Sequence, residues 1–256
     1  MCGALWWPER AQRGRPMRTT ARLACGAAAG AAAAHLLPSV LTVPQLHRLL
    51  APRLSGQSRT SHVALTFDDG PHPVATPLFL DLLADLDAHA TFFLLGSEVE
   101  RYPSTAREIV ERGHEVAVHA TRHVPHLLRT PPAVVIDVDR AYAAVLAATG
   151  HRPRFWRPPN GVLSGTGLAA ALRRRLRPVL WTADGQDWRA DVTPAAVVER
   201  VARQLQPGGT VLLHDSDITS ASGSWRTTLA AVPGLVRRCR DYGWQVGPLR
   251  EHWGVE

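Results

Sequence analysis

Short apolar runs alternate with segments of helical spacing along most of the chain, and this alternation limits the folds open to it. Runs with strand character, rich in β-branched, aromatic or leucine residues, lie at 62–67, 90–95, 114–119, 178–182 and 209–214. Helical spacing lies at 76–88, 97–112, 131–149, 164–176, 194–206 and 225–242. Strands that alternate with helices form parallel sheets covered by helices. The sequence therefore predicts an α/β fold, either a barrel or an open sheet.

Charge is distributed unevenly along the chain. Residues 1–60 hold eight arginines and one acid, and so they carry the whole formal charge of +7. The remaining residues have equal numbers of basic and acidic side chains. A neutral main domain lacks the basic surface that nucleic-acid binding requires, so we expect no nucleic-acid partner. The three cysteines have no CxxC spacing, which predicts neither a disulfide framework nor a thiolate metal site.

The N-terminal segment has the composition of a targeting sequence. Five arginines between residues 10 and 22 precede an apolar stretch without formal charge at 23–37. A basic start followed by an apolar stretch rich in small residues is typical of a signal peptide. The stretch is short and weakly hydrophobic for a membrane span, which needs about 20 apolar residues. We expect export or membrane anchoring, with an alanine-rich helix packed on the domain as the alternative.

Polar side chains gather where the predicted strands end. They are Asp68 and Asp69, His119 and His123, Arg157, Asp187 with Trp188, and His214. In βα barrels and in open α/β sheets, the carboxyl ends of the strands form the rim at which sites are built. Five strand ends that all deliver acids, histidines or an arginine predict one functional site at that rim.

The spacing of the histidines suggests a metal ion at this site. His119 and His123 are four residues apart, so they can point the same way on a helical turn and share one ion. Two histidines and one carboxylate leave coordination positions open, as in a catalytic zinc site. The adjacent Asp68 and Asp69 repel each other, and a cation or a nearby arginine would compensate for that repulsion.

Five short motifs support a family resemblance. In chain order they are TFDDGP, HATRH, RPPNG, DGQDW and VLLHD, spread over residues 66–215. As an ordered set they resemble the motifs of the polysaccharide deacetylase family (NodB homology domain, carbohydrate esterase family 4). The resemblance covers nearly all of 62–250 and implies a distorted (β/α) barrel of about seven strands. That family removes N-acetyl groups, and sometimes O-acetyl groups, from sugar polymers such as chitin and peptidoglycan.

The resemblance implies roles at the matching positions. Asp69, His119 and His123 would hold a divalent metal, usually Zn²⁺, with Co²⁺ or Ni²⁺ as alternatives. Asp68 would be the general base, oriented by Arg157 through a salt bridge.

Further roles concern the leaving group and the pocket. His214 would be the general acid, held and charged by Asp187, and a backbone N–H near Asn160 would stabilise the oxyanion together with the metal. The expected pocket residues are Pro159, Asn160, Gly161, Trp188, Val211 and Leu213.

Two positions depart from the family pattern. Ala120 stands where the family commonly has Ser or Thr between the histidines, and that hydroxyl braces the loop, so a lower metal affinity is expected. Asn160 stands where an aromatic residue follows the two prolines. Its backbone amide can still serve the oxyanion, so we expect an effect on the sugar surface more than on the chemistry.

The resemblance implies a metal-dependent hydrolase that releases acetate from an amino-sugar polymer. The alternatives are an O-acetyl esterase or amidase on another substrate, and an inactive sugar-binding module of the same fold. We expect an N-terminal segment over 1–58, made of a signal peptide or membrane anchor plus a connector, and a catalytic domain over 59–256. We further expect an N-acetylated glycan as substrate, membrane association through the N-terminal segment, a monomer, and a location at the bacterial cell envelope.

Overall fold

The computed structural model describes residues 26, 29–43, 46 and 49–253. In this part of the chain, parallel strands form one curved sheet in the order β5-β4-β3-β2-β1-β7-β6, and β8 pairs with β1. The strands are β1 (His62–Asp68), β2 (Thr91–Leu95), β3 (Glu115–Ala120), β4 (Phe155–Trp156), β5 (Arg177–Pro178), β6 (Ala183–Asp184), β7 (Thr210–His214) and β8 (Gln245–Gly247). The predicted distorted (β/α) barrel of about seven strands is confirmed.

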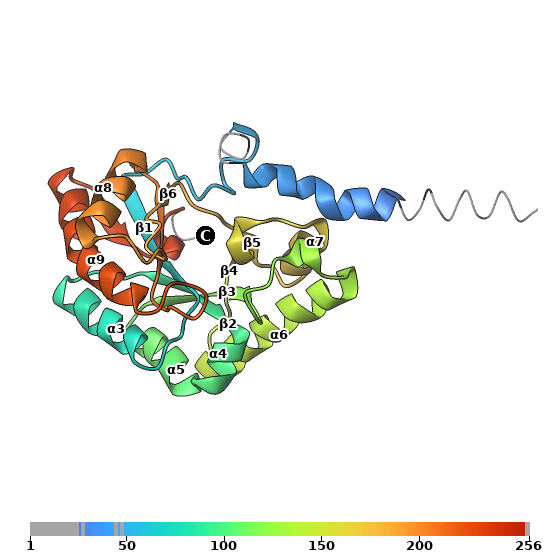
Figure 1. The fold of residues 1–256 in the computed structure, drawn as a ribbon, viewed down its shortest axis with the longest axis horizontal. Helices are drawn as coiled ribbons and strands as arrows, with labels where there is room; N and C mark the ends of the chain where they lie inside the picture. Colours follow the sequence, from blue (N-terminus) through green and yellow to red (C-terminus); the bar gives the residue numbers. More distant parts are fainter. Residues whose placement is uncertain (1–25, 27–28, 44–45, 47–48, 254–256) are drawn as a thin grey trace, which may run out of the picture.

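The barrel is open between β5 and β6, which form the two ends of the sheet (Figure 1). The strand predicted at 178–182 is wrong, because residues 179–182 connect these two short strands instead. Leu180 N donates to Leu54 O of the connector (2.7 Å), and Thr182 N donates to Thr210 O (2.9 Å). The connector therefore supplies one of the hydrogen bonds that a neighbouring strand would supply in a closed barrel, and β7 supplies the other.

Helices cover the outer side of the sheet (Figure 1). They are α3 (Ala75–Asp85), α4 (Gly96–Arg101), α5 (Pro103–Glu111), α6 (Pro131–Thr149), α7 (Gly165–Arg173), α8 (Pro194–Gln204) and α9 (Ser224–Asp241). The 3₁₀ turns are η1 (Leu37–Thr42), η2 (His126–Leu128), η3 (Pro159–Gly161) and η4 (Leu249–Glu251). The single helix expected at 97–112 is two helices, because Pro103 lacks an N–H and begins a new one. Thr193 caps α8, where its side chain accepts from Ala196 N.

Side-chain alternation along the strands sets the site residues inside the barrel. In β1, Leu65 and Phe67 pack in the main core beneath the helices, where Phe67 stacks on Phe92 with ring centroids 5.1 Å apart. Thr66 and Asp68 therefore point to the opposite, interior face, since successive side chains in a strand alternate. The interior row of β1 thus ends in a carboxylate at the rim.

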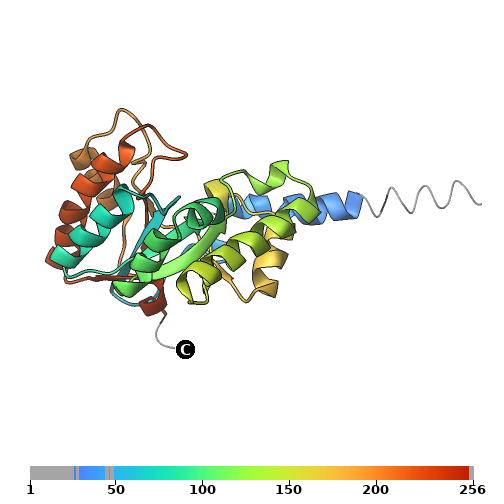
Figure 2. The same ribbon diagram turned by 90° about the horizontal axis from the view of Figure 1, so that it is seen from below.

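The described part of the N-terminal segment packs beside α7. Residues 29–36 are helical, and His35 Nδ1 lies 2.8 Å from Thr166 Oγ1. Figure 2 shows this helix running along the α7 side of the barrel and away from the sheet. The arginines at 10–22 and part of the apolar stretch lie outside the described residues. Among the described helices, none combines the length and apolar character that crossing a bilayer requires.

Two buried histidines join the ends of the domain. His252 Nε2–H donates to Gly56 O (2.6 Å), so His252 Nδ1 carries no proton. It accepts a hydrogen bond from His62 Nδ1–H (3.0 Å). His62 Nε2 is then the unprotonated nitrogen of that ring, and it has no hydrogen-bond partner within the described residues. Burial, together with the nearby His252, lowers the pKa of His62 to about 4.

The stability of the fold should therefore depend on pH through His62. An unfolded histidine titrates near pH 6.5, so unfolding between pH 4 and 6.5 takes up a proton and becomes easier as the pH falls. From pH 7 to pH 5 this contribution should lower the free energy of unfolding by about 2 kcal/mol. His62→Asn keeps a donor for His252 and removes the titration. Urea unfolding should show a larger acid-induced loss in the wild type than in the variant, and equal losses would contradict the assignment.

Candidate active site

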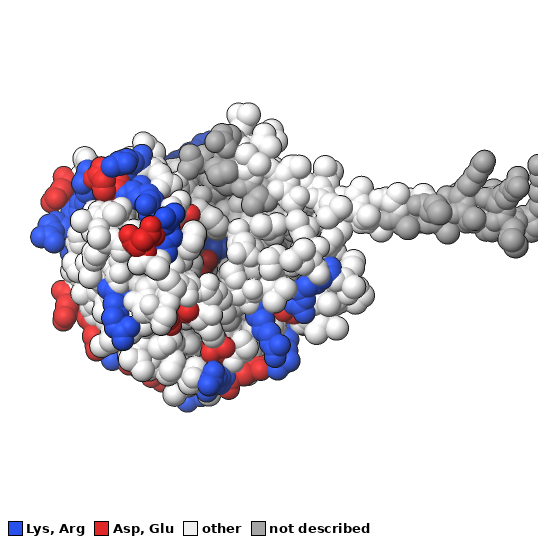
Figure 3. Space-filling view, viewed as in Figure 1, with Lys and Arg blue, Asp and Glu red and all other residues white. Residues whose placement is uncertain are grey.

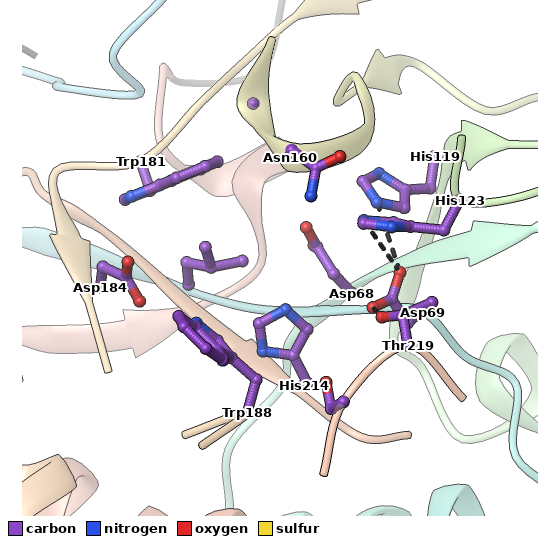
Figure 4. A pocket seen from close by; sticks show the side chains of 13 residues that line it. Asp68, Asp69, His119, His123, Asn160, Trp181, Asp184, Trp188, His214 and Thr219 are labelled. Atoms are coloured by element: carbon purple, nitrogen blue, oxygen red, sulfur yellow. Dashed lines mark hydrogen bonds and ion pairs between the residues drawn. The ribbon is translucent and has the colours of Figure 1, made fainter. Parts of the chain in front are cut away.

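A pocket of about 370 Å³ lies at the carboxyl ends of the strands (Figures 3 and 4). It is lined by Asp68, Asp69, His119, His123, Asn160, Gly161, Trp181, Asp184, Trp188, Leu212, His214, Thr219 and Ser220. Around it, arginines and acids are interspersed on the face shown in Figure 3, which agrees with a neutral main domain. The rim thus brings together side chains that are far apart in the chain, such as Asp69 and Thr219, which are separated by 150 positions.

Asp69, His119 and His123 form a cluster at one side of the pocket (Figure 4). Asp69 Oδ1 lies 3.4 Å from His119 Nε2 and 3.8 Å from His123 Nε2. The three potential ligand atoms lie within 4.8 Å of one another. The other carboxylate oxygen, Oδ2, accepts a hydrogen bond from the Thr219 hydroxyl. Asp69 Oδ1 is buried and has no hydrogen-bond partner in the described part of the chain.

The hydrogen bonding of His119 leaves its ligating nitrogen without a proton. Its Nδ1 lies 2.8 Å from the carbonyl oxygen of Arg157, and because a carbonyl only accepts, Nδ1 carries the proton. Burial lowers the pKa of His119 despite the attraction of Asp68 and Asp69, so the ring is neutral at pH 7. Its Nε2 lone pair then faces the unpaired oxygen of Asp69. Electron pairs that converge in this way fit a divalent cation, and the set of two imidazoles and one carboxylate suits zinc.

The backbone at Asp69 explains how two consecutive acids both reach the pocket. Neighbouring residues of a strand point to opposite faces, so Asp68 and Asp69 should diverge. Asp69 instead has a φ of 73°, in the left-handed region that aspartate tolerates better than most residues. Its backbone N–H donates to Phe93 O (3.2 Å). This turn ends β1 and directs both carboxylates into the pocket.

Arg157 lies fully buried beneath the pocket and holds Asp68. Its Nη1 donates to Asp68 Oδ1 (2.6 Å) and to Thr66 Oγ1 (2.9 Å), and its Nη2 donates to Leu180 O (2.8 Å). Its guanidinium carbon lies 4.0 Å from the ring centroid of Phe93. The guanidinium therefore fixes one oxygen of Asp68 and leaves the other to face the pocket.

His214 is held by Asp187 on the β6–β7 side of the pocket. Its Nδ1 lies 2.9 Å from Asp187 Oδ1, while Asp187 Oδ2 accepts from His214 N (2.8 Å) and from Thr228 Oγ1 (2.7 Å). Burial acts to lower the pKa of His214, but Asp187, with help from Asp69 and Asp68, outweighs it and raises that pKa to about 10. His214 is therefore protonated at neutral pH and presents Nε2–H to the pocket (Figure 4).

The walls of the pocket differ in part from the sequence prediction. Asn160, Gly161 and Trp188 line it as expected, whereas Pro159 is buried behind them in η3. Val211 and Leu213 were expected in the wall, but the structure places both in the main core. Alternation along β7 gives the wall position to Leu212, next to His214.

Five lining residues were missed by the sequence analysis: Trp181, Asp184, Leu212, Thr219 and Ser220. Asp184 ends β6, so the strand-end argument that selected Asp187 could also have found it. Trp181 lines the pocket from the connection between β5 and β6. Its ring lies so close to Gly161 that a Cβ at that position would come within 2.5 Å of it. Thr219 reaches Asp69 from the irregular β7–α9 loop, and no sequence pattern indicates that contact.

Comparisons with known proteins agree with this geometry. A family model described as polysaccharide deacetylase matches residues 55–179. The chitooligosaccharide deacetylase of Bradyrhizobium sp. (strain ANU 289) is 38% identical over 204 residues, which are 75% of this chain and 90% of that protein. The structure of the peptidoglycan N-acetylglucosamine deacetylase Bc1960 is 26% identical with a TM-score of 0.72, over 78% of this chain and 91% of that one. BA3943, a CE4 family pseudoenzyme from Bacillus anthracis, is 25% identical with a TM-score of 0.69, over 77% and 68%.

Removal of the buried guanidinium should strongly destabilise the fold. Arg157→Met leaves Asp68 buried without its counter-charge, and breaking such a pair costs about 3–5 kcal/mol. Arg140→Met is the matched control, because its two hydrogen bonds to Glu100 join exposed side chains. The free energies of unfolding of the wild type and both variants are measured with a denaturant in the presence of a metal chelator. A loss no larger for Arg157→Met than for Arg140→Met would contradict the role of this pair.

Proposed function

The chain belongs to the polysaccharide deacetylase family, and we propose that it is a metal-dependent hydrolase that removes N-acetyl groups from an amino-sugar polymer and releases acetate. The polymer we propose is peptidoglycan or a chitin-like oligosaccharide, the substrates in the names of its relatives. One observation carries the proposal: the unpaired Asp69 oxygen and the His119 lone pair converge beside a buried, oriented carboxylate and a protonated histidine.

Asp69, His119 and His123 are the residues we propose as metal ligands. A divalent cation there would supply Lewis-acid activation of the attacking water and of the acetyl carbonyl. The donor set favours Zn²⁺, and Co²⁺ or Ni²⁺ would also accept imidazole and carboxylate ligands. The Thr219 hydroxyl occupies Asp69 Oδ2 and thereby directs Oδ1 to the metal position.

Asp68 is the general base in this proposal. Its Oδ1 is fixed by Arg157, so Oδ2 is the oxygen that takes a proton from the attacking water. His214 is the general acid, and it gives the proton on Nε2 to the nitrogen of the leaving sugar amine. Asp187 keeps that ring oriented through Nδ1 and stabilises its charge. A backbone N–H near Asn160 would donate to the oxyanion that forms on the acetyl carbonyl.

The apolar wall fits the acetyl methyl group and the face of a sugar ring. Trp188 is 44% exposed at the rim, and Leu212 lies beside His214 in the same wall. An exposed tryptophan next to a catalytic acid offers a flat surface on which a sugar can stack. We propose that Trp188 and Leu212, with Asn160 and Gly161 opposite them, hold the acetylated sugar.

We propose that residues 1–58 bring the domain over 59–256 to the bacterial cell envelope, by export or by anchoring. The support is the basic run at 10–22 followed by the apolar stretch at 23–37. In the described part, residues 29–36 pack beside α7, which the alternative of a packed alanine-rich helix also expects. A neutral main domain and a glycan substrate both agree with a function at the cell wall.

The activity should depend on the metal. Acetate should be released from N-acetylglucosamine oligomers or peptidoglycan fragments, should stop after chelation, and should return when Zn²⁺ is added. Parallel assays with Co²⁺ and Ni²⁺ would rank the metals. Binding of the glycan without acetate release would support an inactive module, a state known for the pseudoenzyme with the same fold. Release only from O-acetylated substrates would support the esterase alternative.

Loss of the general acid should lower turnover without loss of the metal. His214→Ala should reduce kcat by roughly 10²–10⁴-fold, the usual contribution of general acid–base catalysis. The metal content of the purified variant, measured by elemental analysis, should equal that of the wild type. His151→Ala, which changes an exposed histidine outside the pocket, is the control and should leave kcat unchanged. Metal loss in His214→Ala would show that the assigned role is wrong.

A further inference from the structure

The loop that carries His123 is held by a helix that contributes nothing to the pocket wall. Residues 121–125 connect β3 to η2, and His123 lies in the middle of this loop. The ring of His119 is fixed by its hydrogen bond to Arg157 O, but within the described residues His123 pairs only with Asp69 and packs beside His119, with ring centroids 5.2 Å apart. The position of His123 therefore depends on whatever fixes the loop.

Asp137 of α6 makes contacts to both sides of His123. Its Oδ2 accepts from the backbone N–H of Thr121 (3.2 Å) and from His126 Nε2 (3.2 Å), and its Oδ1 accepts from Arg129 Nη1. Its backbone carbonyl accepts from Thr121 Oγ1 (2.8 Å). One residue of α6 thus binds the loop two residues before His123 and three residues after it.

The chemistry of this cluster makes it rigid. Asp137 is 3% exposed, and although burial acts to raise its pKa, the hydrogen bonds from His126, Arg129 and Thr121 outweigh it and keep that pKa below its usual value. His126 is fully buried and stacks on Trp156, with centroids 5.9 Å apart and planes 13° apart. A charged acceptor with three donors cannot move without leaving buried polar groups unpaired, which is costly.

We propose that Asp137 is a positioning residue for the metal ligand His123, acting through Thr121 and His126. This inference rests on the proposed function, because it concerns the ion that Asp69, His119 and His123 would hold. Residues that orient metal ligands typically contribute 10–100-fold to metal affinity. The hydrogen bonds of Asp137 to the loop therefore keep His123 Nε2 directed at Asp69 before an ion binds.

Metal affinity of the full chain tests the proposal. Zn²⁺ binding is measured by competition with a chromophoric chelator, and ligand geometry by the visible absorption spectrum after Co²⁺ substitution. Asp137→Ala should weaken Zn²⁺ binding by about 10–100-fold and alter the Co²⁺ spectrum, because His123 is no longer held in place. Asp137→Asn keeps an acceptor for Thr121 N and His126, so its Zn²⁺ affinity should lie between those of the wild type and Asp137→Ala.

Asp139→Ala is the matched control, because Asp139 lies on the same helix and pairs with Arg173 and Arg174 instead of the loop. It should destabilise the metal-free fold and leave the Zn²⁺ affinity within about twofold of the wild type, since it touches no ligand or loop. A purely structural role for Asp137 predicts the same pattern for both alanine variants. An equal loss of Zn²⁺ affinity in both would overturn the proposal.

If Asp137→Ala does not fold, Thr121→Val tests the proposal instead. It removes the hydrogen bond from the Thr121 hydroxyl to the Asp137 carbonyl with little change of side-chain shape. It should weaken Zn²⁺ binding severalfold, and an unchanged affinity with an unchanged Co²⁺ spectrum would overturn the proposal. An unchanged Zn²⁺ affinity and Co²⁺ spectrum in a folded Asp137→Ala would also overturn the proposal, while the proposed function would stand. Failure of the wild-type chain to bind either Zn²⁺ or Co²⁺ would instead remove the proposed function.

Discussion

The buried guanidinium of Arg157 is the interaction on which the rest of the site depends. Its side chain fixes Asp68, and its backbone carbonyl sets the tautomer of His119. One residue at the end of β4 therefore orients both the proposed base and a proposed metal ligand. The buried charge of Arg157 is tolerated because the guanidinium donates to a carboxylate, a hydroxyl and backbone carbonyls and packs on the face of Phe93.

The same principle recurs around the pocket. Several groups proposed to act on substrate or metal are each held by a neighbouring side chain. Asp187 and Asp137 are buried outside the pocket, whereas Thr219 is exposed and lines it. Asp187 holds His214, Thr219 occupies one oxygen of Asp69, and Asp137 fixes the loop of His123. Burial removes water that would compete for these hydrogen bonds, and it also penalises any arrangement that leaves a partner unpaired. The geometry is therefore fixed before a substrate or an ion binds.

Local periodicity predicted the α/β fold and the functional rim at the ends of its strands, but it left a barrel and an open sheet as alternatives, and the family resemblance implied the barrel. Parallel strands end at the same rim, so a polar residue at a strand end lies there, and Asp68 and His214 could be placed from the sequence alone. Val211 and Leu213 were assigned to the pocket from the family resemblance. Alternation along β7 instead places both in the core and Leu212 in the wall, since a one-residue shift exchanges the two faces. Contacts that join distant loops and helices, such as Thr219 to Asp69, have no periodic signal and could not be predicted.

The proposed metal centre also links function to folding. Without a metal, Asp69 Oδ1 is buried with no hydrogen bond from any of the described residues and faces a lone pair of His119, which is an electrostatic cost. The unfolded chain does not have this cost, because water solvates each group separately. A cation that removes the cost must bind the folded state more tightly than the unfolded one, and so it stabilises the barrel by mass action. The groups that make the site reactive are therefore also those through which an ion would stabilise the fold.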